Sequence, residues 1–150
     1  MLSKCFIKFW LSQSLFKGLF GAYFKSMEEA KLLGAAGEDY AAYYLKLQGK
    51  AIVARNVHSS GGELDIIAYD EAQNLYLLVE VKTRTNEDFA NGIEAVGWKK
   101  QKKMQNAAAH FFLNILRWPY VPDFEIHALV LVPNGKDDGS FEVEYYEDLS

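Results

Sequence analysis

The chain has 150 residues, of which half are hydrophobic and 15% are aromatic, and this composition excludes an intrinsically disordered protein. The length is sufficient for one domain with a sizeable hydrophobic core. The formal net charge is −4, and residues 1–26 contain four lysines and no acid, which leaves 12 Lys+Arg against 20 Asp+Glu in residues 27–150. The body is therefore too acidic for a generally basic nucleic-acid binder, and any contact with nucleic acid must come from a local patch.

The first 26 residues form an aromatic and basic extension. Polar residues interrupt it too often for a membrane span, which needs about 20 mostly apolar residues, so we expect no integral membrane segment. It also lacks the core and cleavage site of a signal peptide. Three interpretations stay open: an amphipathic surface helix, a segment packed on the domain, or an artefact of start assignment with Met27 as the natural start. Cys5 is the only cysteine, which fits a cytoplasmic protein.

The body of the chain predicts two helices and five strands. Apolar residues recur at helical spacing in residues 28–48 and 98–116, and Gly49 ends the first of these helices. Shorter apolar or alternating runs predict five strands, at residues 51–57, 63–69, 75–82, 124–132 and 141–146. The order α-β-β-β-α-β-β predicts one α/β domain over residues 27–150, with a mixed β-sheet flanked by helices.

The two strands at residues 63–69 and 75–82 carry charges where buried apolar residues are expected. If their turn is centred on residues 72–73, Asp65 lies opposite Glu80, and Glu63 lies opposite Lys82. These four side chains then share one face at one end of the hairpin. The other face is predicted to be core and carries Leu64, Ile66, Val79 and Val81.

Two carboxylates opposite each other repel, so Asp65 and Glu80 need a proton, a basic side chain or a metal ion between them. Two acidic oxygen donors suit Mg²⁺ or Mn²⁺, which also takes water and phosphate oxygens. Lys82, on the same face, could orient or deprotonate an attacking water or offset charge on a phosphate. The alternative is that Lys82 neutralises both acids in a structural ion network.

Two further groups are candidates for the same site. Glu38 would be an additional metal ligand if the first helix packs over this end of the sheet, and otherwise it is an exposed helical acid. The second helix opens with a basic run at residues 99–103, whose four lysines oppose the helix dipole. Either a phosphate partner compensates this positive charge, or the lysines form a solvated basic face. Gln101 within this run could contact a phosphate, a base or the attacking water. The three histidines form no convincing metal cluster, and we expect His110 and His127 to be buried or half-buried.

Five short motifs follow one another along the chain. They are Gly34-x-x-Gly37-Glu38, Ala54-Arg55-Asn56, Gly62-Glu63-Leu64-Asp65-Ile66-Ile67-Ala68, Val79-Glu80-Val81-Lys82-Thr83-Arg84 and the Lys100-Gln101 step. This series resembles the YraN-like family of small bacterial proteins, which is similar to the PD-(D/E)XK nuclease superfamily and to archaeal Holliday junction resolvases. The resemblance covers about residues 31–132 and implies a restriction-endonuclease-like core.

The resemblance also implies a function, a metal-dependent endonuclease that hydrolyses DNA, with branched or junction DNA as a candidate substrate. Resolution of junctions would favour a homodimer. Asp65 and Glu80 would hold Mg²⁺ or Mn²⁺, with Glu38 as the helix acid, and Lys82 would be the catalytic lysine. Contacts to nucleic acid would come from Lys99, Lys100, Gln101, Lys102, Lys103 and Arg84. The alternative function is a non-catalytic nucleic-acid-binding or adaptor domain. Residues 123–126, Asp-Phe-Glu-Ile, depart from the Arg-Phe-Asp-Val pattern of the family.

Overall fold

The computed structural model describes residues 28–84, 96–134 and 140–149, so the extension at residues 1–26 lies outside the described part. Its elements are α2 (Glu28–Leu47), β1 (Ala51–Ser59), β2 (Gly62–Asp70), β3 (Leu75–Thr83), α3 (Trp98–Ala109), the π-helical turn η3 (His110–Ile115), β4 (Phe124–Pro133) and β5 (Phe141–Tyr146). The predicted order of elements is confirmed. Within the described residues, no helix is both long and apolar enough to cross a membrane.

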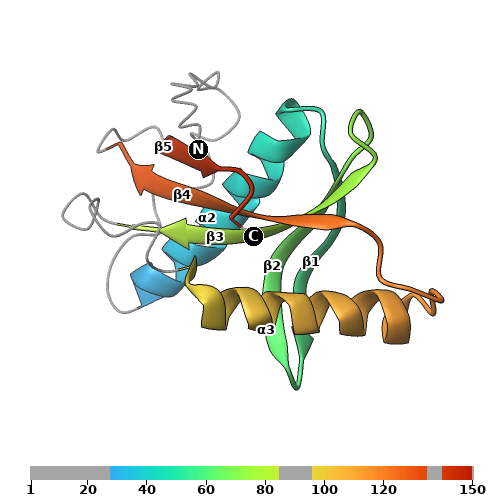
Figure 1. Cartoon of the computed structure of the whole chain (residues 1–150). Helices are drawn as coiled ribbons and strands as arrows, with labels where there is room; N and C mark the ends of the chain where they lie inside the picture. Colours follow the sequence, from blue (N-terminus) through green and yellow to red (C-terminus); the bar gives the residue numbers. More distant parts are fainter. Residues whose placement is uncertain (1–27, 85–95, 135–139, 150) are drawn as a thin grey trace.

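The five strands form one mixed sheet, as predicted, and they lie in the order β1-β2-β3-β4-β5 within it (Figure 1). Strands β3 and β4 are parallel, and the other neighbours are antiparallel. Helix α3 belongs to the crossover between the two parallel strands. Because side chains alternate along a strand, both faces of the sheet are buried: Val79 packs in the core that includes α2, and Leu78 packs in the core that includes α3. The site described below lies on the α3 face.

The register of the β2–β3 hairpin is the predicted one, from Asp70 opposite Leu75 to Ile66 opposite Val79. The ladder ends there, one pair before the predicted partners Asp65 and Glu80. Beyond this point β2 stays paired with β1 down to Gly62, and β3 stays paired with β4 up to Thr83. We call this separation of the two strands the strand fork.

The strand fork corrects two expectations. The predicted pairs Asp65–Glu80 and Glu63–Lys82 are not ladder pairs, because each strand follows its outer neighbour after the fork. Leu64 does not share a core with the rest of the predicted apolar face: it packs with α3, whereas Ile66, Val79 and Val81 pack with α2. Leu64 lies on the part of β2 beyond the fork, where β2 is paired with β1 and no longer with β3.

The turn of this hairpin is fixed by Asp70, a nearly fully buried acid. Its Oδ1 accepts hydrogen bonds from the backbone N–H groups of Ala72, at 3.0 Å, and Gln73, at 3.3 Å, and its Oδ2 pairs with Lys50. The hydrogen bond from Lys50 holds the pKa of Asp70 below its ordinary value. These contacts fix where the chain reverses, and so fix the register that leads to the fork.

The β1–β2 hairpin packs against α3 through two glycines. A Cβ atom on Gly62 would lie 2.2 Å from the backbone oxygen of Lys103, and one on Gly61 would lie 3.0 Å from the Cβ of Asn106. Only a residue without a side chain allows this approach at Gly62, because the obstacle is backbone. The glycine pair therefore sets the distance between α3 and the fork.

We expect Gly62→Ala to destabilise the fold by about 1–3 kcal/mol, because the new methyl group collides with the backbone of α3. Gly34→Ala is the matched control, since a Cβ there meets nothing within 4 Å and alanine is favoured inside a helix by up to about 1 kcal/mol. Urea denaturation of both variants measures the difference. Equal unfolding midpoints for the two variants would contradict this packing.

Candidate active site

The strand fork brings together the acids predicted from the hairpin. Asp65 on β2 accepts a hydrogen bond through Oδ2 from the backbone N–H of Val81 on β3, at 2.8 Å. This N–H points toward β2, so the carboxylate takes the place of a backbone acceptor where the ladder stops. Glu80 directly precedes Val81 and, two residues after Leu78, lies on the α3 face. The fork thus places both acids at one point of the sheet.

Glu80 is the most buried charged side chain of the site, with 1% of its side chain exposed. Its Oε1 pairs with the ammonium group of Lys82, and its Oε2 lies 2.8 Å from Nζ of Lys100 on α3. A buried carboxylate without a cation would be very unfavourable, so these two lysines balance the buried charge of Glu80. We call Glu63, Asp65, Glu80, Lys82 and Lys100 the acid–lysine cluster.

Lys100 joins the buried part of the cluster to its exposed rim. Its side chain is 17% exposed, and its Nζ lies 3.2 Å from Oε1 of Glu63, which is 59% exposed. Burial alone would lower the pKa of Lys100, but the contacts and charge of Glu80, followed by those of Glu63 and Asp65, outweigh burial and raise it. The hydrogen bond from Lys100 in turn lowers the pKa of Glu63. Lys100 is therefore held as a cation.

Asp65 is the group whose charge is least well compensated. Burial, and then the negative charge of Glu80, raise its pKa from 3.8 to about 6. The hydrogen bond from Val81 and the charges of Lys100 and Lys82 act in the opposite direction without cancelling this effect. A raised carboxyl pKa beside a second carboxylate indicates a site that would gain from an additional cation.

The donor atoms of the cluster fit one divalent cation. Asp65 uses only Oδ2 for Val81, and the two buried oxygens of Glu80 receive no hydrogen bond of ordinary geometry and have ion-pair partners instead. Two carboxylates with water and phosphate oxygens are a usual donor set for Mg²⁺. Asp65 and Glu80 are the residues that could hold the ion, and an ammonium group must move to make room on Glu80.

The structure does not bring Glu38 to these acids. Helix α2 covers the opposite face of the sheet, and Gly37 packs there against Thr83 at the end of β3. Among the described residues, no group of three or more His, Cys, Asp or Glu side chains is arranged to hold a metal ion. The cluster therefore offers two acidic donors, and a role for Glu38 stays a prediction.

Gln101 points away from the cluster, and its neighbour Lys100 points into it. The Gln101 side-chain amide donates to the backbone oxygens of Leu149, at 2.7 Å, and Val96, at 3.1 Å, so it fastens the C-terminal segment to α3. Successive helical residues point about 100° apart, so only one of the two can face Glu80. Helical spacing could have identified it, because Lys100 precedes the buried Met104 by four residues and shares its face.

The other basic residues of the predicted nucleic-acid surface are distributed around this site. Lys99, Lys102 and Lys103 are exposed on α3, and Lys99 also lies 5.7 Å from the ring centroid of Trp98. Arg84 follows β3 and is half-buried, and its Nε has no hydrogen-bond partner in the described residues. In the described part of the chain, these three lysines are therefore exposed where an anionic partner could reach them.

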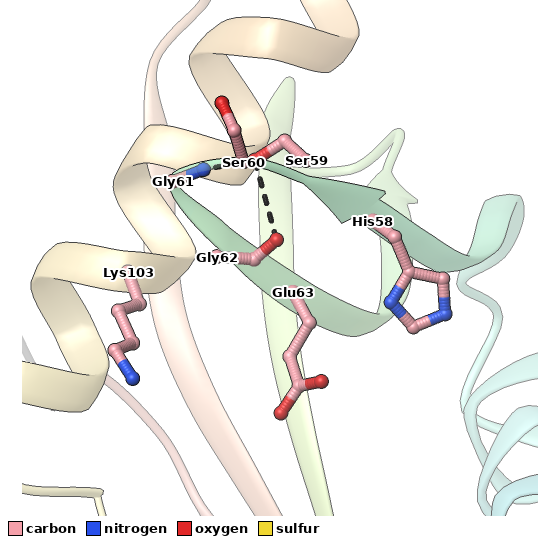
Figure 2. Close-up of a pocket in the computed structure, with 7 residues that line it drawn as sticks. All are labelled: His58, Ser59, Ser60, Gly61, Gly62, Glu63 and Lys103. Atoms are coloured by element: carbon pink, nitrogen blue, oxygen red, sulfur yellow. Dashed lines mark hydrogen bonds between the residues drawn. The ribbon is translucent and has the colours of Figure 1, made fainter.

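A cavity of about 330 Å³ lies between the β1–β2 turn and α3, lined by residues 58–63 and Lys103 (Figure 2). We call it the rim pocket. Its walls are polar: Ser59 Oγ donates to the backbone oxygen of Gly62 and accepts from the N–H of Gly61. Because Glu63 lines the pocket and also contacts Lys100, the rim pocket adjoins the acid–lysine cluster.

Two histidines take the positions expected of them. His127 is buried in β4 between the hydroxyl of Tyr145, at 2.6 Å, and Oε2 of Glu125, at 3.0 Å. His110 is half-buried on η3, and its Nδ1 lies 3.2 Å from Nδ2 of Asn114. Both rings have structural partners and lie outside the acid–lysine cluster.

The sequence of the site lies within a region shared with other proteins. Residues 37–130 match the profile of the "Uncharacterised protein family UPF0102". The chain belongs to this family. Its relatives include a UPF0102 protein of Dictyoglomus turgidum, 36% identical over 107 residues that cover 71% of this chain and 88% of the relative. Another, of Herpetosiphon aurantiacus, is 29% identical over 125 residues that cover 82% of this chain and 97% of the relative.

A UPF0102 protein of Treponema pallidum is 43% identical over 81 residues, which cover 54% of this chain and 63% of the relative. The family match contains the whole acid–lysine cluster and the rim pocket. The cluster therefore belongs to the part of the chain that is aligned with the family, which confirms the resemblance to the YraN-like proteins.

The raised pKa of Asp65 predicts a pH-dependent effect of Asp65→Asn. Between the ordinary value of 3.8 and about 6, the folded chain binds a proton at Asp65 more readily than the unfolded chain, so this residue costs stability as the pH rises. We expect Asp65→Asn to be more stable than the wild type by on the order of 1 kcal/mol at pH 7.5, and the gain to vanish near pH 4. Asparagine can still accept the hydrogen bond from Val81.

Urea denaturation between pH 4 and pH 8 measures this difference, with Asp123→Asn, at an exposed aspartate, as the control. If Asp65→Asn is more stable than the wild type by the same amount at every pH, burial and Glu80 do not disfavour the charged form of Asp65.

Proposed function

We propose that this protein is a metal-dependent endonuclease that hydrolyses phosphodiester bonds of DNA, and that branched DNA is among its substrates. The observation that carries the proposal is the acid–lysine cluster. It joins the buried carboxylate of Glu80 and the half-buried carboxylate of Asp65, from adjacent strands, to a lysine on the same strand as Glu80, at the strand fork. The pairing of acids and lysine matches what a hydrolytic phosphate site requires, namely negative donors for a cation and a positive group for the phosphate.

Each residue of the cluster has a distinct task in this proposal. Asp65 and Glu80 would hold Mg²⁺ or Mn²⁺, which when bound polarises the phosphate and lowers the pKa of water. Lys82, whose side chain is 36% exposed, would orient the attacking water or offset the charge that develops on the phosphate oxygens. The hydrogen bond from Val81 would keep Asp65 in a single orientation.

The surroundings of the cluster support DNA as the substrate class. The exposed lysines of α3, one of which, Lys103, also lines the rim pocket, provide local positive charge on an otherwise acidic chain. Phosphate contacts of this kind supply position and affinity without reading sequence. Preference for branched DNA is the finer part of the proposal, and it draws on the resemblance to junction resolvases.

We expect the purified chain to cleave DNA in the presence of Mg²⁺ or Mn²⁺ but not of EDTA, and Glu80→Gln to reduce the rate at least about a hundredfold. The loss follows because glutamine removes a donor charge while both lysines remain. Labelled duplex, single-stranded, flap and four-way-junction DNA, analysed on denaturing gels, measure the rate and the preferred structure.

Glu142→Gln is the matched control, since Glu142 is exposed on β5. Circular dichroism on both variants separates loss of activity from loss of fold. Cleavage that persists in folded Glu80→Gln and Asp65→Asn chains would exclude this site, and absence of products with every DNA would exclude the activity.

The second candidate function is a nucleic-acid-binding domain without turnover. The observation that favours it is that both oxygens of Glu80 already have lysine partners, as in a structural ion network. In that case the exposed lysines of α3 would still bind phosphates, and Asp65 and Glu80 would serve the fold.

Both functions require DNA binding through α3, which a salt titration measures. We expect the double variant Lys102→Ala/Lys103→Ala to lower the slope of log Kd against log salt by about 2, because two phosphate contacts are lost. Lys46→Ala, in the last turn of α2 on the other face of the sheet, is the control. An unchanged slope would show that DNA does not contact this part of α3.

A further inference from the structure

Lys100 occupies a position in the cluster that the proposed cleavage chemistry does not use. Its Nζ lies 2.8 Å from Oε2 of Glu80 and 3.2 Å from Oε1 of Glu63, so it bridges a buried carboxylate and an exposed one. Lys82 occupies the other oxygen of Glu80. Each oxygen of Glu80 therefore already faces an ammonium group, and neither is open to a metal ion unless one lysine moves.

The two lysines differ in what they would lose by moving. In the described part of the chain, Lys82 has one acid partner, Glu80, from its own strand. Lys100 comes from a separate element and has a second partner, Glu63, at the exposed rim. A Lys100 side chain that leaves Glu80 keeps its charge paired and enters a more solvated position. Lys100 is therefore the lysine of the two that has a second carboxylate in contact to balance its charge when it leaves Glu80.

We propose that Lys100 is an exchangeable counter-cation of Glu80: it positions this carboxylate when no metal is bound and moves to Glu63 when a divalent cation binds. This inference rests on the proposed metal site at Asp65 and Glu80. An ammonium group and a divalent cation on the same carboxylate repel each other strongly in a buried site. The free energy of separating Lys100 from Glu80 is then subtracted from the free energy of metal binding.

The exchange gives Lys100 a role opposite to that of a simple structural residue. Removing a structural lysine would weaken the site, and metal binding would weaken with it. Removing a competing lysine would destabilise the metal-free chain but tighten metal binding. The two roles are therefore distinguished by the sign of the change in metal affinity, with no need for a substrate.

Calorimetric titration of Mn²⁺ into the full-length chain without DNA tests the exchange. We expect Lys100→Met to bind Mn²⁺ about tenfold more tightly than the wild type, equivalent to about 1.4 kcal/mol, and to unfold at a lower temperature without metal. Lys100→Gln, which keeps a donor for Glu80 but no charge, should show the same tightening. Lys102→Met, at an exposed position on the same helix, should bind Mn²⁺ like the wild type.

Asp65→Asn separates failure of the exchange from failure of the metal site. If the wild type binds Mn²⁺ and Asp65→Asn does not, but both folded Lys100 variants bind no more tightly than the wild type, the exchange is wrong and the metal site stands. If no chain binds Mn²⁺, the metal site and the exchange are both wrong. Binding by the Lys100 variants alone would be the strongest support for the exchange.

Discussion

The burial of one carboxylate, that of Glu80, is the constraint on which the architecture of the site depends. A charge taken out of water inside a five-stranded sheet must be balanced at close range, and the fold provides this balance from two directions. Lys82 comes from the same strand, and Lys100 reaches in from α3. The second contact requires α3 to lie close to the fork, which the absence of a side chain at Gly62 allows. Gly62 in the β1–β2 turn thus allows the contact between Lys100 and Glu80, although it is distant from both in the sequence.

Much of the fold could be predicted because it is encoded in local patterns. Alternation and helical spacing gave the order of elements, and the turn after Asp70 gave the correct register of β2 with β3. The fork could not be predicted, because it results from competition between neighbouring strands, and pairing of one hairpin says nothing about the outer partners. The same limit explains why Leu64 was placed in the wrong layer.

The positions of the candidate site residues could be predicted in part, and the differences share a cause. The hairpin pattern identified Asp65, Glu80 and Lys82, and the structure brings these together. Whether Lys100 or Gln101 faces Glu80 depends on the rotation of α3 about its axis. Charge alone does not indicate this rotation, because lysines occur on several sides of the helix. The place of Glu38 depends on which face of the sheet α2 covers, which is a property of tertiary packing.

The structural ion network and the metal site need not be rival explanations of the same residues. The ion network around Glu80 balances the charge of this carboxylate in the folded chain, and under the proposal the same network would take part in the binding equilibrium of a divalent cation. A site of this kind trades metal affinity for stability in the free state. The residues of this network lie within the part of the chain that matches the UPF0102 family.

The parallel pairing of β3 with β4 has a consequence for the order in which the molecule forms. Strands β1, β2 and β3 are joined by short turns, whereas the paired residues Tyr76 and Phe124 are about 48 positions apart in the chain. Local hairpins form faster than contacts that close long loops. We therefore expect the meander to assemble first and to bring Asp65 and Glu80 together before α3 delivers Lys100. Until the crossover helix docks, the newly formed acid pair would then have Lys82 but not Lys100 to balance its charge.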